Sequence, residues 1–144
     1  MPGIVVGIDG STGSRQALEW AAHEATLTHA ALTVLTVHPV MASPWTGNPL
    51  VDPVDVEAAE KARAVAEEAA LKVTSQLDAQ PSSVTVKALS GFVVPELIAA
   101  SREADLLVVG SRGGGGFASL VLGSVSSQVV SHASCPVVVV PSQR

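Results

Sequence analysis

The stretch DLLVVGSRGGGGFASLVLGSVS (residues 105–126) decides the fold. It begins with a short aliphatic run that ends at a glycine, which is typical of a strand buried in a parallel sheet. A glycine-rich segment follows, and residues 124–132 then have the pattern of a short helix. A strand that passes through a glycine-rich loop into a helix predicts one repeating unit of an α/β protein.

The rest of the chain repeats this alternation. Strands are predicted at residues 3–9, 31–38, 83–89, 105–110 and 136–141, and helices at residues 11–29, 54–78, 91–103 and 124–132. In the second helix, Val65, Ala69, Val73 and Leu77 recur at every fourth residue and predict its apolar stripe. The order predicts one domain over residues 1–144, an α/β fold with a single open parallel sheet and helices on both faces.

The composition favours a cytoplasmic protein. The net charge of -5 argues against binding to nucleic acid or to anionic lipid, since both require a basic face. Apolar runs such as residues 106–109 are too short to span a membrane, and no basic region with a cleavage site precedes the first strand. Cys135 is the single cysteine, which fits a reducing compartment. We therefore expect no nucleic-acid partner, no membrane partner and no signal peptide.

Two common phosphate-binding motifs do not fit the glycine-rich segment. A P-loop needs a lysine directly after its last glycine, and none of Lys61, Lys72 and Lys87 lies there. Gly113, Gly115 and Ala118 match the dinucleotide fingerprint G-x-G-x-x-A. That fingerprint belongs after the first strand, with an acidic residue about 20 positions later, and here no acidic residue follows.

A third pattern, Gly110-x2-Gly113-x9-Gly123-Ser124, remains. Together with VGIDGS (residues 6–11) and SCPVVVVP (residues 134–141), it resembles the universal stress protein family over residues 4–141. The resemblance implies an adenine nucleotide alpha hydrolase-like fold, with a five-stranded sheet in the order 3-2-1-4-5. It also implies a site for ATP in the members that retain this motif, and every position of the motif is present here.

The motif also suggests how an anion is held without a lysine. Gly110 leaves room for a ligand at the end of its strand, and Gly113 allows close approach of the backbone and a positive φ. The first turn of the next helix presents unpaired N–H groups, and the hydroxyls of Ser124 and Ser126 add two donors. Mg²⁺ is expected to help neutralise the phosphates. The candidate residues at this end are Gly110, Ser111, Arg112, Gly113, Gly123, Ser124, Val125 and Ser126.

Asp9 marks the other end of the predicted site, at the end of the first strand. The resemblance implies that this aspartate and the residues before it contact the adenine and the ribose. Gly7 and Ile8 then lie along the base, and Val37 forms its apolar side. From the residues alone, an equally supported role for Asp9 is to cap the first helix; the resemblance favours the ligand role.

Other polar and aromatic residues give weaker signals. The four histidines and Cys135 have no metal-ligand spacing, so no metal site held by side chains is expected. His38 ends a strand and would border the site. Trp45 is either a lid or an exposed loop residue. No nucleophile-elbow motif is present, and no catalytic residue is assigned.

These features predict an ATP-binding universal stress protein that acts as a nucleotide-responsive regulator in the stress response. No lysine or general base is evident beside the expected phosphates, so any ATPase activity would be weak. Two alternatives remain open: a slow ATP-hydrolysing enzyme, and a nucleotide-free dimeric interaction module.

The last predicted strand indicates a dimer. In the order 3-2-1-4-5 it lies at the edge of the sheet, where exposed valines favour aggregation unless they are covered. A second copy related by a two-fold axis would cover them, and the resemblance also implies dimers through this strand. We therefore expect a homodimer through Val137, Val138, Val139 and Val140.

Overall fold

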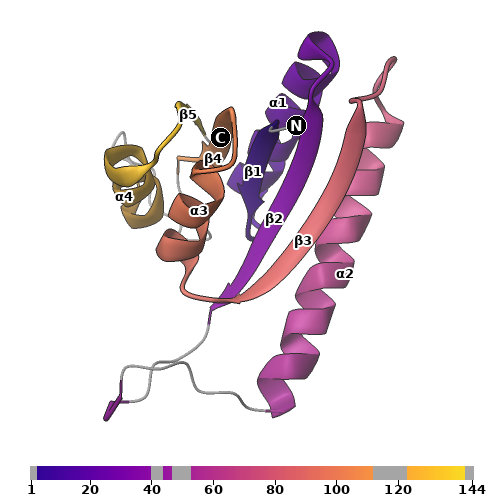
Figure 1. Cartoon of the computed structure of the whole chain (residues 1–144). Helices are drawn as coiled ribbons and strands as arrows, with labels where there is room; N and C mark the ends of the chain where they lie inside the picture. Colours follow the sequence, from indigo (N-terminus) through magenta and orange to yellow (C-terminus); the bar gives the residue numbers. More distant parts are fainter. Residues whose placement is uncertain (1–2, 40–43, 47–52, 112–122, 142–144) are drawn as a thin grey trace.

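The structure, a computed structural model, describes residues 3–39, 44–46, 53–111 and 123–141. The strands form one parallel sheet in the order β3-β2-β1-β4-β5, which confirms the predicted fold class and strand order (Figure 1). The order reverses between β1 and β4. The elements are β1 (Ile4–Ile8), α1 (Thr12–Thr28), β2 (Ala31–Pro39), α2 (Pro53–Ser75), β3 (Ser83–Gly91), α3 (Val93–Ser101), β4 (Leu106–Gly110), α4 (Ser124–His132) and β5 (Val137–Val140).

Two apolar cores lie on the two faces of the sheet. Side chains alternate along each strand, so Val34 of β2 faces α1 and α2, whereas its neighbour Leu35 faces α3 and α4. Figure 1 shows α3 and α4 on the opposite side of the sheet from α2. The strands β1, β2 and β4 are largely buried on both faces for this reason, as their apolar runs predict, whereas most residues of the edge strand β3 are exposed.

Helix α1 lies close to the sheet because small residues form its buried face. Ala17, Ala21 and Ala25 are fully buried, together with Leu18. Ser11 caps the helix, since its side chain accepts a hydrogen bond from the N–H of Ser14. The position of α1 fixes the first turn of this helix against the ends of β1 and β4.

The predicted stripe of α2 is partly wrong. Val65 is 54% exposed, whereas Ala66, Ala70 and Val73 are buried against the sheet. A step of four residues advances about 40° around a helix beyond a full turn, so a strict four-residue repeat drifts away from the core. None of the described helices, α2 included, has the length and apolar character needed to cross a membrane.

Strand β5 ends the sheet on one side. Val138 and Val140 pack against the core beneath α1, and Val137 and Val139 pack against the core beneath α3 and α4. The carbonyls of Pro136 and Val140 accept hydrogen bonds from the N–H groups of Leu107 and Ser111, at 3.0 and 2.9 Å. In a parallel pair only alternate residues bond to a given neighbour. The main-chain groups of Val137 and Val139 therefore point to the open edge.

Candidate functional site

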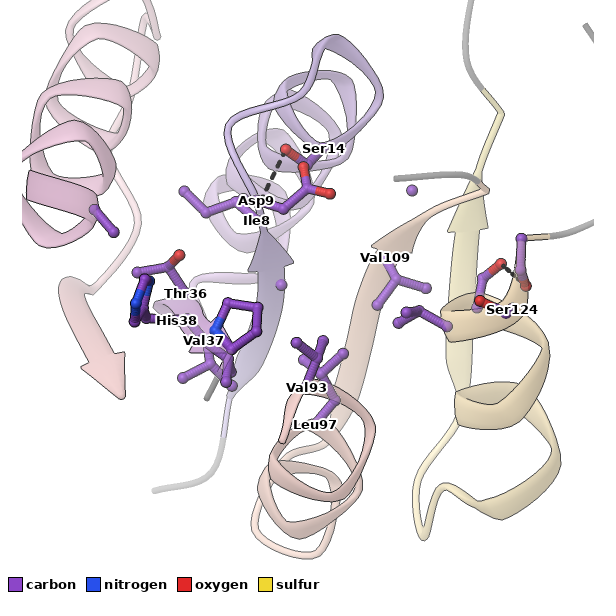
Figure 2. Close-up of a pocket in the computed structure, with 18 residues that line it drawn as sticks. Ile8, Asp9, Ser14, Thr36, Val37, His38, Val93, Leu97, Val109 and Ser124 are labelled. Carbon is purple, nitrogen blue, oxygen red and sulfur yellow. Dashed lines mark hydrogen bonds between the residues drawn. The ribbon is translucent and has the colours of Figure 1, made fainter. Parts of the chain in front are cut away.

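A cavity of about 700 Å³ opens where the strands end at the reversal of strand order (Figure 2). β1 stops at Ile8, which pairs with Thr36, while β2 continues to Pro39 alongside β3. On the other side, β4 continues beyond its pairing with β1 to Gly110, alongside β5. The short central strand therefore leaves a notch between two longer neighbours, at the position where ligands bind in open α/β sheets.

Most of the predicted site residues line this cavity. They are Gly7, Ile8, Asp9, Val37, Gly110, Gly123, Ser124, Val125 and Ser126. Ser111 lies next to the cavity. Its main-chain carbonyl accepts hydrogen bonds from Gly123 and Ser126, which line the cavity wall. Arg112 and Gly113 lie outside the described residues. The exposed Trp45 is not among the residues that line the cavity.

Asp9 forms a tight turn at the end of β1. The N–H of Ser11 donates to Oδ1 of Asp9 at 2.9 Å, and the N–H of Asp9 donates to Oγ of Ser14 at 3.2 Å. The hydroxyl of Ser14 in turn donates to the carbonyl of Ser11 at 3.0 Å. Gly10, between Asp9 and Ser11, has a φ of 85°, a conformation that glycine adopts without strain. Ser11 rather than Asp9 caps α1, so Asp9 holds the turn with one oxygen while it lines the cavity.

The first turn of α4 is tied to the end of β4. The carbonyl of Ser111 accepts two hydrogen bonds, from the N–H of Gly123 at 2.7 Å and from the hydroxyl of Ser126 at 2.8 Å. The Ser126 hydroxyl also approaches the carbonyl of Gly123 at 3.1 Å, and the residue is 2% exposed. The sequence predicts that this hydroxyl donates to a ligand. Its proton is instead used within the chain, which leaves the exposed Ser124 as the hydroxyl donor at this end.

Gly110 is needed because the end of β4 packs closely against the first turn of α1. A Cβ atom there would lie 3.1 Å from the carbonyl carbon and oxygen of Gly13, in the first turn of α1. A Cβ atom on Gly7 would lie 2.8 Å from a methyl group of Leu97 in α3. Gly110 therefore lets two elements of the cavity wall meet. It also lines the cavity, and its expected role of leaving room for a ligand stays a prediction.

Several lining residues were missed from the sequence. Ser14, Leu35, Thr36, Pro39, Ala62, Val93, Leu97 and Val109 line the cavity, and His38 borders it as expected. Val93 and Leu97 lie one turn apart in α3, and that i, i+4 spacing was the available signal. Their place in the wall depends on how α3 packs, which the spacing alone does not give.

The described cavity wall carries little charge. Asp9 is the only carboxylate among the described lining residues, and no lysine or arginine is among them. The described part of the chain also holds no group of three side chains suited to a metal ion. The wall can therefore offer hydrogen-bond donors from α4, one carboxylate, and apolar surface.

Cys135 does not add a nucleophile to this site. It precedes β5, and its thiol lies 3.4 Å from the carbonyl of Pro136. Burial raises the pKa of the Cys135 thiol and the charge of Asp105 raises it slightly further, while a hydrogen bond from the backbone of Leu107 acts in the opposite direction. The thiol therefore stays protonated at neutral pH and is not among the lining residues.

Comparison with known proteins gives consistent matches. The sequence profile of the universal stress protein family matches residues 2–141. A universal stress protein of Mycobacterium tuberculosis is 38% identical over 153 aligned residues, covering 98% of this chain and 48% of the relative. The chain thus spans about half the length of the curated relatives it matches.

Solved structures match over nearly the whole chain. UspA from Lactobacillus plantarum is 26% identical, with a TM-score of 0.79 and coverage of 96% of this chain and 97% of that one. A universal stress protein in complex with cAMP is 25% identical, with a TM-score of 0.68 and coverage of 99% and 98%. The sheet has the adenine nucleotide alpha hydrolase-like fold of these proteins.

Proposed function

The chain belongs to the universal stress protein family, and we propose that it binds ATP in the cavity and acts as a nucleotide-responsive regulator in the stress response. The observation that carries the proposal is the notch at the reversal of strand order, which is lined by the first turn of α4 and by Asp9 at the end of β1. The proposal treats residues 1–144 as one nucleotide-binding domain. The solved relative in complex with cAMP supports an adenine nucleotide as the ligand class.

The phosphates would lie at the first turn of α4. The N–H groups of Ser124, Val125 and Ser126 have no acceptor within the helix, because an acceptor four residues earlier would lie outside it. The positive end of the helix dipole points the same way. An anion can thus be held by backbone groups and the Ser124 hydroxyl, without a lysine in the described wall.

Mg²⁺ fits this site as an ion carried by the nucleotide. Asp9, the single carboxylate of the described wall, is assigned to the base end, so the phosphates of ATP would supply the oxygen ligands that Mg²⁺ prefers. Mg²⁺ usually keeps several of its waters, so it needs few protein ligands. The ion would neutralise the phosphates at the first turn of α4, where no side chain is charged.

The base and the ribose would lie between β1, β2 and α3. Ile8, Val37, Val93 and Leu97 offer an apolar wall for the base. Asp9 is well suited to accept hydrogen bonds from ribose hydroxyls or from the adenine amino group, since a carboxylate only accepts. This orientation places the single negative side chain away from the phosphates.

A regulatory role fits the site better than rapid hydrolysis. Asp9 is held by the turn at the base end, and the described wall offers no other carboxylate to activate a water at the phosphates. α4 begins at the phosphate end and is followed by β5, the edge strand. A nucleotide bound at the start of α4 can therefore alter the position of the edge strand. We expect turnover well below about 1 s⁻¹, the lower end of typical enzymes.

The test is mass spectrometry of nucleotide released from freshly purified protein, followed by isothermal titration with Mg-ATP. We expect an adenine nucleotide in the released fraction and saturable binding by the emptied protein. Fast, multiple turnover of ATP would favour the enzyme alternative. Protein that releases no nucleotide and shows no heat of binding would be an interaction module instead.

Dimerisation through β5 is part of the proposal, and replacing Val139 by proline tests it. The N–H of Val139 points to the open edge, so proline removes a hydrogen bond to a partner copy and none to β4. Light scattering is expected to give the mass of two chains for the wild type and of one chain for Val139→Pro. Val139→Ala, which loses similar packing but keeps the N–H, should remain a dimer. A dimeric Val139→Pro protein would place the interface elsewhere.

A further inference from the structure

His38 carries a polar atom that neither the fold nor the proposed site uses. Its Nε2 atom is buried and has no hydrogen-bond partner, and among the buried side-chain nitrogen and oxygen atoms of the described residues it alone is in this position. The ring lines the cavity near the end of β2. A buried nitrogen without a partner destabilises the free protein, because it has lost its bonds to water and gained none.

Among the residues that the structure describes, no protein group forms a hydrogen bond with this nitrogen. Figure 2 shows the ring beside Thr36, on the side of the cavity away from Ser124. Side chains alternate along β2, so His38 points to the same face of the sheet as Thr36, and Ala62 of α2 lines the cavity there. Asp9 is the only charged side chain in the described wall, and its Oδ1 is bonded to the N–H of Ser11.

We propose that His38 is a specificity-determining residue, whose ring turns about its Cβ–Cγ bond when a nucleotide binds and whose Nε2 hydrogen-bonds the edge of the base. This inference rests on the proposed function and deepens it. α4 receives the phosphates at the far end of the cavity, so the group that reaches His38 is the base. Imidazole can donate or accept depending on its tautomer, and the edges of adenine carry both acceptor nitrogens and a donor amino group.

The proposal gives His38 opposite effects on folding and on binding. In the free protein the unpaired nitrogen lowers stability, and in the complex the same nitrogen contributes a hydrogen bond. An apolar side chain of similar size should therefore raise the melting temperature of the free protein and weaken its affinity for ATP. A residue with only a structural role would not move the two quantities in this way.

The experiment compares His38→Leu with His38→Gln and with His23→Leu as the matched control. His23 is exposed on α1 and lies outside the cavity. Each protein is stripped of ligand, its melting temperature is measured, and it is titrated with Mg-ATP and with inorganic tripolyphosphate. We expect His38→Leu to melt about 3 °C higher and to bind ATP about fivefold to tenfold more weakly, with unchanged affinity for tripolyphosphate. His38→Gln, which retains a polar nitrogen, should recover at least half of the lost ATP affinity on a logarithmic scale. His23→Leu should match the wild type in both melting temperature and ATP affinity.

The outcomes separate this inference from the proposed function. If the wild type binds ATP and His38→Leu binds it equally well, the role of His38 is wrong and the ATP site stands. A lower melting temperature in His38→Leu, or an equal loss of affinity for tripolyphosphate, also overturns the inference, because the ring would then support the fold or the phosphate end. If the wild type binds no nucleotide, both fall.

Discussion

Replacing Gly123 by valine is expected to weaken the binding of Mg-ATP by about a hundredfold, with a loss of only about 1 kcal/mol in the free energy of unfolding. Gly123 has φ -65° and ψ 165°, a conformation that valine also adopts, so the fold tolerates the change. The added side chain stands at the first turn of α4, where it blocks the approach of phosphate. Hydrogen bonds to charged groups contribute roughly 1.5–3 kcal/mol each, so a hundredfold loss, about 2.7 kcal/mol, corresponds to the loss of one or two of them.

Isothermal titration with Mg-ATP measures the affinity, and urea unfolding measures the stability. Gly123→Ala, with a single methyl group, should fall between the wild type and Gly123→Val in affinity. Wild-type affinity in Gly123→Val would remove α4 from the site. A large loss of stability would instead show that the valine disturbs the fold, and the affinity would then say nothing about the phosphates.

Replacing Gly110 by alanine is expected to lower the free energy of unfolding by about 2 kcal/mol, within the range for overpacked sites. The added Cβ would lie 3.1 Å from backbone atoms of Gly13, and backbone in the first turn of α1 cannot move aside as a flexible side chain can. The end of β4 would separate from α1, and with it one wall of the cavity. Urea denaturation measures the loss, and ATP affinity should fall in the same variant.

Gly10 provides the matched control because its glycine is needed for a different reason. Among the described residues other than its chain neighbours, none has a heavy atom within 4 Å of a Cβ built there, but its φ of 85° disfavours other residues. Gly10→Asn should cost about 1 kcal/mol or less, since asparagine tolerates the left-handed region better than most residues. If Gly110→Ala proved as mild as Gly10→Asn, the close packing of β4 on α1 would not limit stability.

The sequence predicts most of the fold because the local patterns agree with one another. Each aliphatic run is short and ends beside glycine or proline, and each of the first four is followed by a helical segment. The nine predicted elements all form close to their predicted positions. The helical stripe of α2 was only partly correct, because Val65 and Ala66 are both apolar and the pattern does not say which of them faces the sheet. That choice depends on how the helix packs.

The site was predictable at the strand ends and at the start of α4. The residues contributed by α3, and Ser14 of α1, were not, since their positions depend on packing between elements distant in sequence. The role of the Ser126 hydroxyl was also beyond the sequence. It requires the carbonyl of Ser111, fifteen residues earlier, to lie within 2.8 Å. A serine at the start of a helix has the same local pattern whether it faces a ligand or its own chain.

The junction between Ser111 and Gly123 has a use in protein engineering. Ser111 and Gly123 stand on either side of residues 112–122 in the sequence, and the N–H of Gly123 donates to the carbonyl of Ser111 at 2.7 Å. The entropy of closing a segment between fixed ends grows only with the logarithm of its length, by about 0.6 kcal/mol for each doubling. A peptide tag or a small reporter domain inserted between these residues should therefore leave the register of the sheet intact. Because the insertion point adjoins the phosphate end, such a reporter would be well placed to signal occupancy of the cavity.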